Sequence, residues 1–270
     1  MFLIHSIFLI RLFSWLARFR EDGIIILIGA VVGFLSGLLG KGGSAITTPA
    51  LQIFAQVNPF AALASPLPAA LPTTLSASFA YSKNNLINRK VVIFSILIGI
   101  PATIIGSYFS DWLGGSILMI LTAIFVLALG ISFLFFSSFS ETVVAAIVVP
   151  TWKISIVAIS VGFLSGLLAN SGGVLFGPLF IRFLKLPTKQ ALACSLLVAA
   201  GLAVPGTIVH WYLGHINWTI VLWLSISSIP FSYIGARVAL QMKNDILEKI
   251  FGVMLVAFGA FDLWYSFLHR

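Results

Sequence analysis

Charge is what this sequence lacks most. Only 8% of its 270 residues are Asp, Glu, Lys or Arg, whereas 60% are hydrophobic and the mean hydropathy is +1.13. Soluble domains carry about 25% charged residues, so this chain has too little polar surface to cover a globule in water. The composition therefore predicts an integral membrane protein.

Cysteine is also scarce, and the signatures of several enzyme classes are missing. A single cysteine, Cys194, excludes an intramolecular disulfide, and there is no zinc-type cluster or Walker A loop. ATP-driven transport would therefore need another subunit. The apolar stretches hold no paired acids, no histidine–metal constellation and no nucleophile with its base. We therefore expect a protein that is not an enzyme and that has no cofactor or metal.

Long uncharged stretches are abundant, and they determine the predicted fold class. A helix needs about 20 apolar residues to cross ~30 Å of hydrocarbon, so several stretches hold more than one crossing. The alternating segments of about ten residues that are typical of β-barrels are absent. We therefore predict an all-α integral membrane protein. The uncharged stretches are 24–40, 44–82, 91–110, 112–140, 154–181 and 190–236.

The chain contains an internal duplication. The segment GFLSGLL at 33–39 returns unchanged at 162–168, which is an offset of 129 residues. The same offset holds without a gap as far as Gly130 and Gly259. Two copies of one unit of roughly 100 residues therefore make up nearly the whole chain. In an apolar protein this arrangement points to a transporter built from structural repeats.

Each copy is expected to contain about five helical segments. In the first copy, the second segment, 44–57, has fourteen residues and reaches ~21 Å, which is short of a full crossing. The third segment, 60–82, contains three prolines that remove backbone donors and break or kink it. Such irregularity is tolerated at membrane depth only where it faces protein or a wet cavity. The first-copy segments are 24–40, 44–57, 60–82, 91–110 and 114–137.

Basic residues change sides between the two copies. The loop 83–90 of the first copy carries three cations, and its counterpart, 212–219, carries none. Conversely, 182–189 carries three cations in the second copy and its counterpart has none. The positive-inside rule then predicts inverted repeats, with both basic loops cytoplasmic, His215 external and both termini outside the cytosol. Two arginines near the N-terminus argue against the last point.

These patterns divide the chain into four parts. Charges interrupt the first twenty residues, which favours an interfacial helix over a cleaved signal peptide. The net charge of +8 resides in short loops, so the expected partner is the lipid bilayer and not nucleic acid. Association into a homo-oligomer stays open. The predicted parts are an interfacial segment 1–22, repeat one 23–137, a linker 138–153 and repeat two 154–270.

A glycine-rich turn followed by proline occurs in both copies. The first motif turn is 40–43 before Pro49, and the second motif turn is 169–173 before Pro178. With the duplication, length and hydrophobicity, it resembles the TauE/SafE sulfite exporter family, also called the toluene sulfonate uptake permease family. The resemblance covers about residues 24–268. It implies an inner-membrane secondary transporter for sulfite, sulfonates or related small sulfur-containing anions.

Candidate substrate groups gather at the two motif turns. A helix N-terminus exposes backbone N–H groups and carries about half a positive charge, which suits an oxyanion. The alternative is that the glycines serve only helix packing and that nearby hydroxyls bond to helix carbonyls. Lys41, the only cation in either turn, either anchors the helix end or attracts the anion. The candidate substrate-binding residues are Gly42, Gly43, Ser44, Thr47, Thr48, Ser65, Ser171, Gly172, Gly173 and Ser195.

Two ionisable residues are candidates for proton coupling. His210 lies near the end of the third segment of the second copy, and Asp262 is the only acid in the last apolar stretch. Interfacial packing of the histidine and a surface position of the acid are the alternatives. The sequence as a whole predicts a secondary carrier that works by alternating access, with its site between the two turns. An anion channel and an intramembrane enzyme are the rival interpretations.

Overall fold

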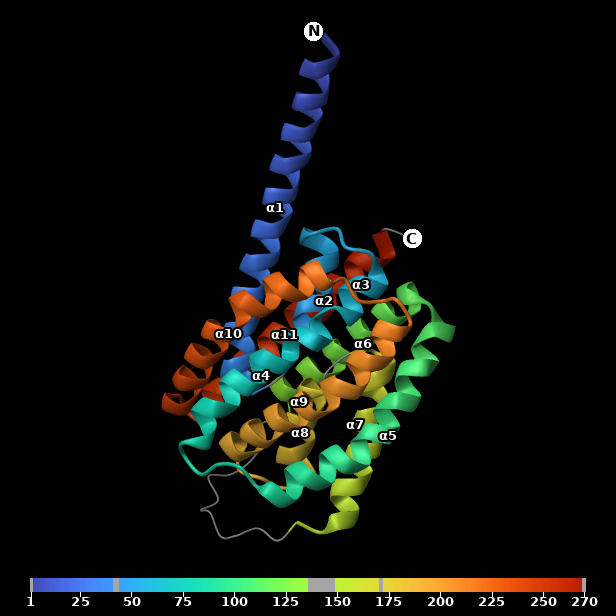
Figure 1. Cartoon of the computed structure of the whole chain (residues 1–270). Coiled ribbons are helices and arrows are strands. Elements are labelled where there is room, and N and C mark those ends of the chain that lie inside the picture. Colours follow the sequence, from blue (N-terminus) through green and yellow to red (C-terminus); the bar gives the residue numbers. More distant parts are fainter. Residues whose placement is uncertain (1, 41–43, 136–148, 170–171, 269–270) are drawn as a thin grey trace.

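The computed structural model describes residues 2–40, 44–135, 149–169 and 172–268. Within these ranges the secondary structure is helical and contains no strand, which confirms the all-α prediction. Figure 1 shows the helices gathered in one bundle, from which the N-terminal half of the first helix extends. The helices are α1 Phe2–Leu39, α2 Ser44–Phe54, α3 Pro59–Ala64, α4 Pro66–Ser82, α5 Arg89–Leu113, α6 Gly115–Phe135, α7 Thr151–Leu167, α8 Gly173–Arg182, α9 Thr188–Tyr212, α10 Trp218–Gln241 and α11 Asn244–Leu268.

The helices of the two halves follow one another in the same order at the 129-residue offset. Short α2 corresponds to α8, α5 to α10, and α6 to α11, and α7 corresponds to the C-terminal half of α1. One pair differs, because Ser65 separates α3 from α4 whereas α9 is continuous. Pro66 has no backbone N–H to donate, and Ser195 stands at the equivalent position of α9. The predicted proline break is thus confirmed in the first copy.

The duplication extends to the contacts between helices. Helix α1 packs on α10 and α7 packs on α5, so the first helix of each copy lies against the fourth helix of the other. A Cβ atom on Gly37 would lie 1.9 Å from the Ser232 carbonyl oxygen, and one on Gly166 would lie 2.0 Å from that of Thr103. Both glycines and both carbonyls are related by the offset. This reciprocal exchange is what a pseudo-twofold axis produces, while the inverted orientation in the membrane stays a prediction.

The long helices have the dimensions of membrane spans. In the described part, Glu21–Leu39 of α1 and the whole of α5, α9 and α10 are long and apolar enough to cross a bilayer. Leu27 and Leu97, on α1 and α5, are each 64% exposed, as expected for side chains that face lipid. With 11 and 10 residues, α2 and α8 reach only ~16 and ~15 Å, or about half of the hydrocarbon thickness.

The predicted N-terminal boundary at residue 22 falls inside α1, which is continuous from Phe2 to Leu39. The predicted linker includes residues 136–148, which lie outside the described ranges, and α7 begins at Thr151. The two basic loops, 83–90 and 182–189, lie at one end of the bundle, and the α9–α10 turn lies at the other (Figure 1). The structure thus places the predicted cytoplasmic loops together.

Candidate functional site

Gly40, the first residue of the first motif turn, is fixed against the other copy. Gly40 follows α1 with a φ of 62°, a conformation that glycine adopts without strain. A Cβ atom there would lie 2.3 Å from the Cβ of Leu192, so no side chain fits. The Gly40 carbonyl also accepts a 2.6 Å hydrogen bond from the Ser195 hydroxyl. Helix α9 therefore holds the end of α1 in place.

The second motif turn leads directly into α8. Ala169 and Gly172 have φ values of 45° and 73°, and the Gly172 carbonyl accepts hydrogen bonds of 2.9 Å from the N–H groups of Leu175 and Phe176. The fully buried ring of Phe176 lies against Gly172, at 3.0 Å from a Cβ built there. The start of α8 is therefore packed against an aromatic side chain.

A small cavity, lined by apolar and hydroxyl side chains, lies beside the first turn of α2. Its volume of about 20 Å³ is enough for a single water-sized group. Three hydroxyl residues line it, namely Thr47 of α2, Thr73 of α4 and Ser228 of α10, and Gly29 and Gly33 of α1 form another wall. We call this space the hydroxyl cavity. The oxygens of Thr73 and Ser228 are 2.5 Å apart.

Two of the hydroxyl residues that line the cavity are replaced by apolar side chains in the second copy. The offset relates Thr47 to Phe176 and Thr73 to Leu202, and both of these replacements are completely buried. The lining of the hydroxyl cavity comes from the first copy and from α10, and it includes no residue of α8. The repeat symmetry of the backbone is therefore broken in the side chains at this point.

The start of α2 contributes a partial positive charge beside the hydroxyl cavity. Thr47 is the fourth residue of α2, so the cavity adjoins the N-terminal turn of that helix. The first turn of any helix has backbone N–H groups without intrahelical acceptors and carries the positive end of the helix dipole. Hydroxyls can donate to the same ligand. The arrangement suits a small group with several acceptor oxygens.

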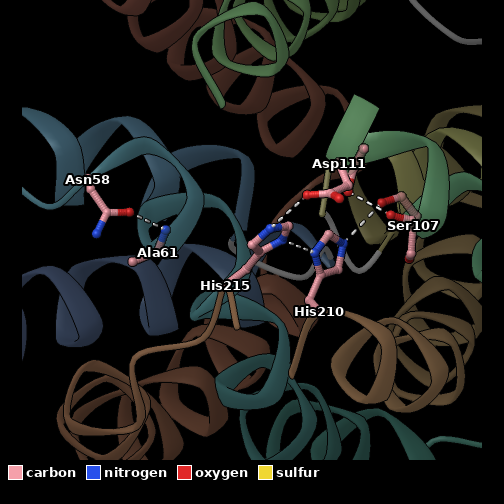
Figure 2. Close-up of polar contacts among 8 residues, drawn as sticks. Asn58, Ala61, Ser107, Asp111, His210 and His215 are labelled. Carbon is pink, nitrogen blue, oxygen red and sulfur yellow. Dashed lines mark hydrogen bonds and ion pairs between the residues drawn. The ribbon is translucent and has the colours of Figure 1, made fainter. Parts of the chain in front are cut away.

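A second polar cluster joins the ends of α9, α5 and α7 (Figure 2). The Nδ1 atoms of His210 and His215 are 3.1 Å apart, and the Nε2 of His210 is 3.3 Å from the Gly166 carbonyl oxygen. The Nε2 of His215 is 3.5 Å from a carboxylate oxygen of Asp111, and its ring stacks on Phe60 with centroids 4.2 Å apart. Burial lowers the pKa of His215 below its ordinary value, and the Asp111 carboxylate opposes this shift.

The sequence matches a known family over most of its length. The model described as sulfite exporter TauE/SafE matches residues 25–261. This chain belongs to the sulfite exporter TauE/SafE family. The family assignment agrees with the resemblance seen in the two motif turns.

Relatives of similar length are described as transporters. The chain is 28% identical over 244 residues to a probable membrane transporter protein of Xylella fastidiosa strain Temecula1, covering 88% of this chain and 93% of that protein. It is 24% identical over 259 residues to the probable membrane transporter protein YunE of Bacillus subtilis strain 168, covering 87% and 95%. No solved structure matches the chain. This TauE/SafE protein is therefore a membrane transporter and not an enzyme.

Several predicted site residues of this TauE/SafE protein fall where the structure gives no side-chain position. Ser44 begins α2 and Asp262 lies in α11, with only their place in the helix described. The residues outside the described ranges are Lys41, Gly42, Gly43 and Ser171.

The remaining predicted residues lie in different surroundings. Thr47 reaches the hydroxyl cavity, and Thr48 is buried beside it on α2. Ser65 and Ser195 instead bond to the backbone, because Ser65 accepts the N–H of Asn217 at 3.0 Å and Ser195 donates to the first motif turn. Ser195 also donates to the Leu192 carbonyl of its own helix, as in the alternative interpretation, whereas Ser65 acts as an acceptor. Gly172 and Gly173 shape the second motif turn, and His210 belongs to the histidine cluster.

The sequence interpretation missed Ser228 and Asp111 as site residues. Ser228 aligns with Gly99 at the 129-residue offset, so a hydroxyl replaces a glycine in a helix that is otherwise equivalent. Asp111 is the one charge between the fourth and fifth segments of the first copy. In both cases the sequence signal was a residue that differs from its counterpart in the other copy. Such a difference does not show which side chains lie in contact in the folded protein.

Proposed function

We propose that this TauE/SafE protein is a secondary carrier of small sulfur-containing anions, of the sulfite or sulfonate type. The observation that carries the proposal is the hydroxyl cavity at the positive end of α2. Sulfite and sulfonates have three oxygens that accept hydrogen bonds, and three hydroxyl residues, Thr47, Thr73 and Ser228, line the cavity. The name of the family supports the same class of substrate.

The size of the hydroxyl cavity supports alternating access. A sulfur oxyanion has at least four heavy atoms, whereas the cavity holds about one water-sized group in its 20 Å³. Substrate entry therefore requires α1 and α10 to separate from α2 and α4. Rocking of one repeat-derived bundle against the other supplies that opening. The proposed site includes Lys41 and the glycines of both motif turns, of which Lys41, Gly42 and Gly43 lie outside the described residues.

The direct test is flux into proteoliposomes. We expect saturable uptake of at least one of sulfite, sulfoacetate, sulfate and thiosulfate, together with counterflow of labelled anion against an unlabelled internal pool. Counterflow requires a carrier, whereas an anion channel conducts without it. No saturable flux for any of the four anions would contradict the proposed substrate class.

We also propose that the protein lies in the inner membrane. The end of the bundle that carries the basic loops 83–90 and 182–189 then faces the cytoplasm. We expect a cysteine at exposed Asn84 to be labelled from the cytoplasmic side and a cysteine at exposed Tyr212 from the outside. The background variant Cys194→Ser should fold normally. Cys194 accepts the N–H of Asn88, and at the equivalent position Ser65 accepts the N–H of Asn217. Labelling of both cysteines from one side would end the inverted-repeat proposal.

A further inference from the structure

The cluster in Figure 2 forms a linear chain of four polar groups. The Gly166 carbonyl stands at one end and the Asp111 carboxylate at the other, with the histidine pair His210 and His215 between them. Each imidazole uses one ring nitrogen toward its partner and the other toward an outer group. The Gly166 carbonyl and an ionised Asp111 carboxylate can only accept hydrogen bonds. This fixes the number of protons that the four polar groups require.

The proton count follows from the geometry. The outer nitrogens each need a proton, because a carbonyl and a carboxylate have none to give. The facing Nδ1 atoms, 3.1 Å apart, share one more. Three protons on four ring nitrogens are one more than two neutral imidazoles carry. The chain is therefore complete when the histidine pair holds one excess proton, whose charge Asp111 balances.

We propose that Asp111, His215 and His210 form a proton site that loads one proton from the end of the bundle opposite the basic loops. As a proton site it stands on this geometry alone. As the coupling site of transport it rests on the proposed carrier function.

The burial of the three side chains is graded from the surface inward. Asp111 is 54% exposed, His215 is 8% exposed and His210 is 1% exposed. A proton arriving at the carboxylate can therefore pass to the outer and then to the inner imidazole. Burial opposes a charge on His215, and the Asp111 carboxylate favours it.

Unpaired hydroxyls continue the polar path into the bundle. The hydroxyls of Thr103 and Ser107 are buried without a hydrogen-bond partner, and they lie two turns and one turn before Asp111 on α5, respectively. Thr207, one turn before His210 on α9, is unpaired as well. A buried hydroxyl without a partner costs about 1–3 kcal/mol, which proton-carrying groups or water would offset.

The charges around the histidine pair are few. Among the described residues in contact with it, Asp111 of α5 is the charged group, whereas Phe60 of α3 and Gly166 of α7 are neutral. The cations of α8 and of the start of α9 lie at the far end of α9, since Lys189 and His210 are separated by roughly 30 Å of helix. The proton affinity of the pair is therefore controlled mainly by Asp111.

The proton site can be tested without any substrate. The protein has four histidines, so His5→Gln with His269→Gln leaves the pair alone for ¹⁵N NMR. We expect both imidazoles to shift together as one shared proton is bound when the pH is lowered. Asp111→Asn should lower the proton affinity of the pair about tenfold. Glu21→Gln, at an exposed acid of α1, should leave it unchanged.

Two results decide the proposal. Independent titration of the two rings, unchanged by Asp111→Asn, would overturn the shared proton site. In proteoliposomes, His210→Gln should retain counterflow of sulfoacetate or sulfite but lose at least tenfold in accumulation driven by a pH gradient. Equal accumulation in both proteins would overturn the coupling role. A wild-type protein without any counterflow would contradict the carrier function, and the NMR titration would still decide the proton site.

Discussion

The Thr73→Val variant is expected to lose at least tenfold in the rate of saturable sulfite uptake at subsaturating substrate. Valine has nearly the shape of threonine, so the change removes a hydroxyl and adds little volume. A hydrogen bond to a charged ligand contributes about 1.5–3 kcal/mol, and 1.4 kcal/mol corresponds to a factor of ten. The loss should therefore fall between about tenfold and a hundredfold.

Thr74→Val is the matched control for this prediction. Both threonines are buried on α4, and each bonds to a carbonyl one turn back, Thr73 to Ala69 at 2.7 Å and Thr74 to Ala70 at 2.6 Å. The two variants therefore lose the same kind of internal bond. Thr73 differs in lining the hydroxyl cavity and in reaching Ser228. Thr74→Val should transport within about twofold of wild type.

Initial rates across a range of sulfite concentrations, in proteoliposomes with matched protein content, measure this difference. A thermal melt of each purified variant shows whether the two lose similar stability. Equal transport by Thr73→Val and Thr74→Val would place the substrate site away from the hydroxyl cavity. A second variant, Thr47→Phe, tests the cavity by filling it. It introduces the residue found at the equivalent position, the buried Phe176, and should also stop uptake.

The Gly37→Ala variant is expected to lower the melting temperature of the purified protein by about 10 °C or to prevent its accumulation in the membrane. The added Cβ would lie 1.9 Å from the Ser232 carbonyl oxygen, where no atom fits. Helices α1 and α10 must then move apart along much of their contact. A steric clash in a packed core costs about 1–3 kcal/mol or more, and backbone atoms have little room to relax.

Gly23→Ala is the control on the same helix. A Cβ at Gly23 would have no atom within 4 Å, so alanine there should leave stability unchanged or raise it by roughly 0.5–1 kcal/mol through helix propensity. Gly166→Ala, at the equivalent crossing of α7 and α5, should be as damaging as Gly37→Ala. A Gly37→Ala protein that melts like wild type would show that the α1–α10 contact is looser than described.

The membrane class, the helical fold and the duplication followed from the sequence by itself. These properties depend only on the order of residues along the chain. The length of an uncharged run determines whether a helix can cross the membrane, and a duplication is detected as identical residues at a constant offset. The fourth segment, predicted at 91–110, is the core of α5 at Arg89–Leu113, with the N-cap side chain of Asn88 accepting the N–H of Val91. The prolines of the third segment likewise predicted the interruption at Ser65, because proline lacks a backbone donor.

Which hydroxyls face a cavity was decided only by the tertiary structure. Ser65, Thr73 and Ser195 have the same chemistry in the sequence, but Ser65 and Ser195 hold backbone groups, and only Thr73 lines the hydroxyl cavity. The outcome depends on which neighbour lies opposite each side chain, and that neighbour is often more than a hundred residues away. Asp111, His210 and His215 come together for the same reason, since the ends of α5 and α9 meet at one end of the bundle.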